Sequence, residues 1–152
     1  PVRSITVHAC RKDDCVKYFL KYLVLLLIGG SIYCMIEVLA RGFSHWTMFL
    51  VGGICFILVG IINEITPKMP LIWQMLLSAV IITAVEFISG CILNIWLGLS
   101  IWDYTDEIGN IFGQICPKHT VYWFLLSAVA IFLDDFIRYK FFGEEKPHYK
   151  IV

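Results

Sequence analysis

Four long apolar runs constrain this chain more than any other feature, because they place it in a lipid bilayer. A hydrocarbon core about 30 Å thick requires about 20 apolar residues in helical form, and the sequence offers such runs at 17–40, 46–63, 71–99 and 121–142. Backbone groups find no water in lipid, and the residues do not alternate as the strands of a barrel would. We therefore predict an all-α, polytopic integral membrane protein. It has four transmembrane helices and a short outer loop, in one transmembrane domain over residues 1–152.

The third run is too long for one simple crossing. Its 29 residues, 71–99, would reach about 43 Å at about 1.5 Å per residue. Ser89 and Gly90 form the natural weak point, because glycine is flexible and two small residues permit close approach by another backbone. The sequence predicts a broken or extended third helix, in which residues 91–100 form a half-helix, an outer extension or a re-entrant element. Paired glycines at 29–30 and 52–53 predict tight contact between the first two helices.

The distribution of charge predicts the orientation. The 12 basic and 12 acidic residues cancel, so no overall field points to a nucleic-acid partner. Ten of the 12 Lys and Arg residues fall in the N-terminal lead, the 64–70 connection and the C-terminal tail, and only Arg41 and Lys118 remain for the other side. The positive-inside rule then places both short tails in the cytoplasm of a multi-pass cell-membrane protein. The lead from Arg3 to Lys17 has no apolar core of signal-peptide type, so we expect the first span to be retained.

Carboxylates inside the apolar runs are the strongest functional signal. An ionised side chain at the bilayer centre costs about 2.5 to 3.5 kcal/mol on insertion scales, so it requires a partner or a role. Helical depth places Glu37 and Glu86 in the same outer half, and Arg41 lies four residues after Glu37, within ion-pair range. Because Arg41 pairs with Glu37, Glu86 has no evident cationic partner. It is either protonated, hydrogen-bonded to Asn94, or able to bind a cationic ligand, a proton or a second chain. The full predicted substrate or ion site comprises Glu37, Arg41, Glu86, Asn94, Trp102, Asp103, Tyr104 and Asn110.

A second polar cluster is predicted at the inner ends of the helices. It comprises Glu64, Asp134, Asp135 and Arg138, with Arg138 able to reach either aspartate by helical spacing. Charged residues near a cytoplasmic boundary can also extend to water and simply anchor a helix. The sequence leaves both interpretations of this inner cluster open.

Several motifs together resemble a known family. They are Glu37-x3-Arg41-Gly42-Phe43, Glu86-Phe87-x-Ser89-Gly90-x-Ile92-Leu93-Asn94, Trp102-Asp103-Tyr104-Thr105 and Asn110-x2-Gly113-Gln114-Ile115-Cys116. This ordered set resembles the ABC-transporter type IV family of small bacterial membrane proteins, also described as ABC transporter permeases. The resemblance implies a membrane protein with these carboxylates at its centre.

Three functions follow from these observations. The first is a small transporter or permease component, acting as a homo-oligomer; the chain has no G-x-x-x-x-G-K-[ST] phosphate loop, so ATP hydrolysis would need an ATP-binding subunit on another polypeptide. The second is an intramembrane enzyme that uses paired carboxylates, or a divalent metal held with Asn94 and Asp103. The third is a non-catalytic sensor or accessory subunit, in which polar groups hold the helices together. The sequence identifies neither a cofactor nor a metal.

Overall fold

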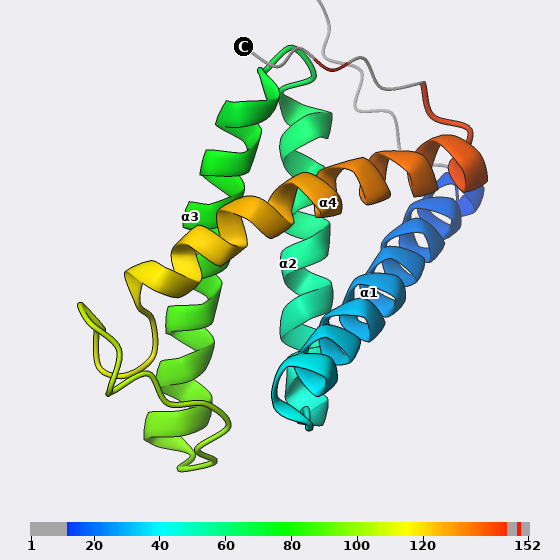
Figure 1. The fold of residues 1–152 in the computed structure, drawn as a ribbon. Coiled ribbons are helices and arrows are strands. Elements are labelled where there is room, and N and C mark those ends of the chain that lie inside the picture. The colour runs from blue at the N-terminus through cyan, green and yellow to red at the C-terminus, as the bar shows by residue number, and fades with distance from the viewer. Residues whose placement is uncertain (1–11, 146–148, 150–152) are drawn as a thin grey trace, which may run out of the picture.

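Four long helices make up nearly all of the computed structural model, which describes residues 12–145 and 149, with side chains from residue 15 onward. The helices are α1 (Lys12–Arg41), α2 (Trp46–Ile65), α3 (Leu71–Gly90) and α4 (Pro117–Phe142), and the π-helical segment η1 (Cys91–Trp96) continues α3 (Figure 1). Each is long and apolar enough to cross a bilayer, with η1 extending the third span. The predicted all-α membrane protein with four spans is confirmed.

Two ends of the bundle carry different connections. The loop end has the α1–α2 turn and the irregular segment 97–116, whereas the terminal end has the α2–α3 turn, the first turns of α1 and the last turns of α4 (Figure 1). α4 begins at Pro117, four residues before the apolar run, because proline at the first helical position has a preset φ and lacks an N–H that would have no partner there.

Glycines bring α1 and α2 into backbone contact. A Cβ on Gly30 would lie 2.3 Å from the carbonyl oxygen of Phe49, and one on Gly53 would lie 2.6 Å from that of Leu26. A Cβ on Gly29 would likewise lie 2.3 Å from Phe56 Cβ. The expected tight packing of the first two helices is therefore confirmed, and any larger side chain at these positions would push the helices apart.

The third helix is extended, and neither a break nor a re-entrant turn occurs within residues 91–96. At Gly90 the helix changes from α to π geometry and continues to Trp96 before the chain enters the loop. Gly90 is small because the loop packs on it: an added Cβ would lie 2.6 Å from Gln114 Oε1 and 3.0 Å from the Trp102 ring. The Ser89-Gly90 pair thus marks a change of helix type and a close contact.

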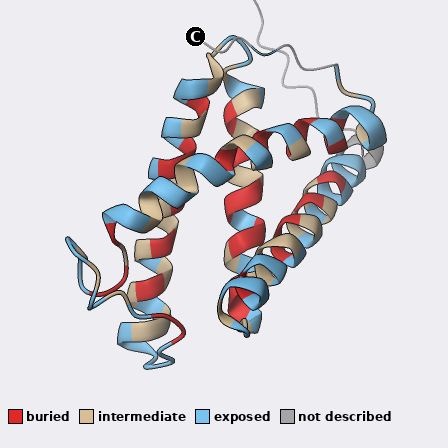
Figure 2. Cartoon of the chain, viewed as in Figure 1, coloured by how far each residue is buried: buried red, intermediate tan, exposed pale blue. Residues whose placement is uncertain are grey.

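α4 crosses the bundle diagonally (Figure 1). It lies against α3 near the loop end and approaches α1 near the terminal end, so α1 and α4 diverge toward the loop end (Figure 1). Buried positions concentrate on the facing sides of the helices, and the outward sides are exposed (Figure 2). One apolar cluster joins α2, α3 and α4 around Val59, Ile82 and Ile131, and another joins α1, α2 and α4 around Leu25 and Phe56.

Candidate functional site

Glu86 is a buried carboxylate on α3 held by two neutral donors. Its side chain is 5% exposed. Tyr104 Oη donates to Oε1 over 3.0 Å, and Trp123 Nε1 donates to Oε2 over 2.8 Å. An indole N–H can only donate, and each carboxylate oxygen has its own donor, which suits the ionised, acceptor-only form of the side chain. Among the residues that the structure describes, no cation forms an ion pair with Glu86.

The two donors reach Glu86 from segments that are distant in sequence. Trp123 lies in the second turn of α4, where that helix packs on α3. Tyr104 lies in the loop, stacked on His119 with ring centroids 4.0 Å apart. Burial raises the pKa of Tyr104 well above its usual range, and the nearby charge of Glu86 acts in the same direction. Tyr104 is therefore a neutral donor throughout the physiological pH range.

Glu37 has charged and hydroxyl partners. Arg41 Nη2 lies 2.5 Å from Glu37 Oε1, as the four-residue spacing predicted, and Ser44 Oγ donates to Oε2 over 2.5 Å. Arg41 also donates from Nη1 to the carbonyl of Ile101 over 3.0 Å, which ties the end of α1 to the loop. Arg41 is therefore occupied by Glu37 and by the loop and does not neutralise Glu86.

Asn94 organises the start of the loop and does not bond Glu86. Its Nδ2 donates to the carbonyl of Trp102 over 3.0 Å and to Gln114 Oε1 over 2.8 Å, while its Oδ1 accepts from the amide of Ile101 over 2.7 Å. The Trp102 indole donates to the carbonyl of Gln114 over 3.0 Å and is 6% exposed. Of the alternatives that the sequence left open for Glu86, a bond to Asn94 does not occur, because Asn94 uses these partners to fold the loop onto η1.

Asp103 and Asn110 lie farther out and shape turns. The hydroxyl and amide of Thr105 both donate to Asp103 Oδ1, and these bonds hold the pKa of Asp103 below its usual value. Asn110 donates to the carbonyls of Thr105 and Glu107, each over 2.9 Å. Asp103 is exposed, and the structure does not bring it to Glu86. Among residues 12–145 and 149, no group of three or more His, Cys, Asp or Glu side chains is arranged to hold a metal.

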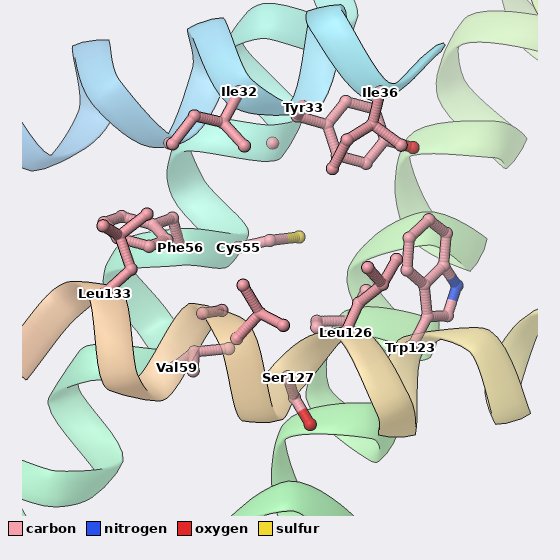
Figure 3. A pocket seen from close by; sticks show the side chains of 15 residues that line it. Ile32, Tyr33, Ile36, Cys55, Phe56, Val59, Trp123, Leu126, Ser127 and Leu133 are labelled. Atoms are coloured by element: carbon pink, nitrogen blue, oxygen red, sulfur yellow. The ribbon is translucent and has the colours of Figure 1, made fainter. Parts of the chain in front are cut away.

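An apolar cavity of about 110 Å³ lies between α1 and α4, backed by α2 (Figure 3). Tyr33 and Trp123 lie at one end of it, with ring centroids 6.0 Å apart and planes 29° apart, while Phe56 and Leu133 lie at the other end (Figure 3). The Trp123 nitrogen points away from the cavity, toward its bond with Glu86. Glu86 therefore lies behind the Trp123 ring, within electrostatic range of Tyr33 and Cys55.

Arg138 is the centre of the terminal-end cluster. It is 3% exposed and lies 2.5 Å, Nε to Oδ2, from Asp134, which is fully buried. Its Nη1 bonds Glu64, and Glu64 also bonds Lys21 and accepts from Tyr22 Oη over 2.9 Å. The cluster thus connects α1, α2 and α4. Of the two aspartates that spacing allowed, Arg138 pairs with Asp134.

Asp135 has different partners and faces a polar cavity. Asn63 Nδ2 and Tyr149 Oη each donate to it over 2.7 Å. The cavity, about 650 Å³, is also lined by Glu64, Arg138 and Glu144. Of the described side chains in this region, two buried ones each retain an atom without a partner, Asp134 Oδ1 and Arg138 Nη2. All four residues predicted for the inner cluster therefore lie together, although Asp135 is bonded separately.

Several partners were absent from the sequence-based sets: Trp123, Gln114, Lys21, Tyr22, Glu144 and Tyr149. The sequence does not mark Trp123 as a partner of Glu86, because a tryptophan near the start of an apolar run is just as typical of a residue at the membrane interface that faces lipid. Lys21 could have been found, since it lies inside the first apolar run at the same end as Glu64 and Arg138.

Four membrane-spanning helices with charged side chains buried between them define a polytopic integral membrane protein. The chain belongs to the family described as "Putative ABC-transporter type IV", whose model matches residues 17–150. The family resemblance of the sequence motifs is confirmed. No curated protein and no solved structure matches the chain.

Proposed function

We propose that the protein is a small membrane transport component whose substrate or ion site is built on Glu86. A charged side chain inside a membrane span is a functional-site candidate by default, because lipid makes it costly. Glu86 is buried, and its described partners are Tyr104 and Trp123, both neutral; Trp123 in turn lines the cavity between α1 and α4. This uncompensated carboxylate carries the proposal. Membership of a transporter family supports it.

The proposal includes an orientation and an assembly. The terminal end holds Lys17, Lys21, Arg138 and Lys140 and would face the cytoplasm, so the Glu86 site would lie toward the outer side. Four helices enclose little space, so we propose that the chain acts as a homo-oligomer. Any ATP hydrolysis would occur on another subunit, since the chain lacks a phosphate-loop motif.

The experiment is transport by the purified full chain in proteoliposomes. Inward gradients of H⁺, K⁺ and hexyltrimethylammonium are applied in turn, and charge movement is recorded by electrometry on a supported membrane. We expect the wild type to carry at least one of them and Glu86→Gln to reduce that flux at least about tenfold, because the substitution removes the charge at nearly constant volume. The control is Glu107→Gln, which changes a loop carboxylate paired with Lys118 at 2.6 Å.

Two results would overturn the proposal. One is an unchanged flux in a Glu86→Gln protein that elutes at the wild-type position in gel filtration. The other is a wild type that moves none of the three ions, alone or with the subunits that co-purify with it.

A further inference from the structure

We infer that the cavity between α1 and α4 binds the head of an alkylammonium ion, a class of lipophilic organic cation. The inference rests on the proposed function, since it names the substrate class for the Glu86 site. Charge, aromatic geometry and access from the membrane support it independently.

Charge is the first argument. Glu86 lies behind one lining residue, Trp123, whose indole N–H it accepts, and its charge acts on Tyr33 and Cys55, both of which line the cavity. Arg41 is engaged by Glu37 and by the carbonyl of Ile101. An occupant that carries a positive charge is therefore favoured over a neutral hydrocarbon chain, which would leave Glu86 as it is.

Aromatic geometry is the second argument. Tyr33 and Trp123 present stacked rings at the cavity end nearest Glu86 (Figure 3). Aromatic faces attract quaternary ammonium groups, and tryptophan does so best. The Trp123 N–H donates to a carboxylate, which pushes electron density into the indole ring and makes its face more negative. The cavity thus offers a cation-attracting surface without a charged atom in direct contact.

Size and access are the third argument. The cavity has a volume of about 110 Å³ and is partly open, so it admits only a small ammonium head, and a chain attached to the head has to extend outward. Two lining residues, Ile36 and Val129, are 36% and 63% exposed on the candidate spans α1 and α4, so the cavity opens on a surface that the bilayer would cover. An alkyl chain attached to the head would continue between the two helices into the bilayer.

The test is calorimetric titration of the full-length protein in nanodiscs with hexyltrimethylammonium, and with hexanol as the neutral comparison. The ion should bind at least about tenfold more tightly than hexanol. Glu86→Gln should remove most of this preference. Trp123→Phe keeps a ring but loses the donor to Glu86, and it should weaken binding of the ion about three- to tenfold. Trp46→Phe, at a position 70% exposed and outside the cavity, should change nothing.

A space-filling variant keeps the inference testable if Glu86→Gln fails to fold. The Cys55 thiol points into the cavity (Figure 3), so Cys55→Leu should abolish binding of the ion without touching the two bonds to Glu86. Equal affinities for the ion and hexanol would indicate a site for neutral chains and would overturn the inference, as would wild-type binding in both Trp123→Phe and Cys55→Leu. Binding without transport would contradict the proposed function alone, and transport of H⁺ or K⁺ without binding of the ion would contradict this inference alone.

Discussion

Glu37 and Glu86 are both acids on membrane-spanning helices, yet their neighbours differ in kind. Glu37 has a guanidinium from Arg41 and a hydroxyl from Ser44. Among the described residues, the side chain of Glu86 is bonded by Tyr104 and Trp123 alone, which stabilise a negative charge without cancelling it. A carboxylate already paired gains little from a cationic ligand, whereas one held by dipoles alone can gain much. This difference makes Glu86 the centre of the candidate site.

Tyr104 gives a prediction about pH. Its folded-state pKa lies well above the ordinary 10.0. Above pH 10 the unfolded chain therefore releases a proton that the folded protein retains, so this residue makes the folded state lose stability as pH rises. Tyr104→Phe should remove the part of the loss of folding free energy above pH 10 that Tyr104 causes. It should also cost about 1 to 3 kcal/mol at pH 7, because Glu86 loses a donor.

The measurement is the free energy of unfolding in detergent between pH 7 and pH 11. Tyr18→Phe is the control, since Tyr18 is 61% exposed on α1. Wild type and Tyr104→Phe curves that stay parallel across this range would show that Tyr104 does not retain its proton as described.

At the scale of elements, the continuation of α3 as η1 fixes the loop over Glu86. The π segment carries Asn94 to the point where it bonds both ends of the loop, at Ile101 and Trp102 on one side and at Gln114 on the other. Trp102 and Gln114 in turn pack on Gly90. The position of Tyr104, and therefore its bond to Glu86, depends on this arrangement.

Asn94→Leu should loosen the loop while leaving the α1–α2 pair intact. The change keeps a similar side-chain size and removes three hydrogen bonds, each worth about 1 kcal/mol. Amide hydrogen exchange in residues 97–116 should accelerate at least about tenfold, with α2 unchanged. Ile95→Leu, next to Asn94 at a position 56% exposed, is the control. Unchanged exchange in the loop of Asn94→Leu would contradict this role.

The sequence predicts the elements well because each depends on local information. Apolar length determines the four spans, and the Glu37–Arg41 contact follows from helical spacing within one element. The π geometry of η1 has no comparable signature in the sequence. Trp123 could not be assigned to Glu86 from sequence because 37 residues separate them and the angle at which α4 crosses α3 decides the contact.

At the scale of the whole molecule, the two ends of the bundle carry different sets of charged side chains. Ion pairs among Lys21, Glu64, Arg138 and Glu144 gather at the terminal end. The loop end carries Glu37, Arg41 and Glu86 beneath the folded loop. Because basic residues are concentrated at the terminal end, the positive-inside rule predicts that this end faces the cytoplasm.

Thiol labelling tests the orientation. Ile108, 94% exposed at the loop end, and Glu145, exposed at the terminal end, are each replaced by Cys. In intact cells a membrane-impermeant maleimide should label Ile108→Cys at least about fivefold above the unchanged chain. Glu145→Cys should react only after the membrane is permeabilised. The reverse pattern would place the Glu86 site on the cytoplasmic side.

The glycine contacts between α1 and α2 have a mechanical consequence for the cavity between α1 and α4. Gly30 and Gly53 bring α1 and α2 together at the backbone, which couples the movement of one helix to that of the other. The pair is joined to α4 at the terminal end by the ion pair between Glu64 and Arg138, whereas at the loop end α1 is linked to the loop by the 3.0 Å bond from Arg41 to the carbonyl of Ile101. A rotation of α1 and α2 away from α4 about the terminal end would therefore widen the opening of the cavity toward lipid. It would break the bond from Arg41 to Ile101 and keep the ion pair between Glu64 and Arg138.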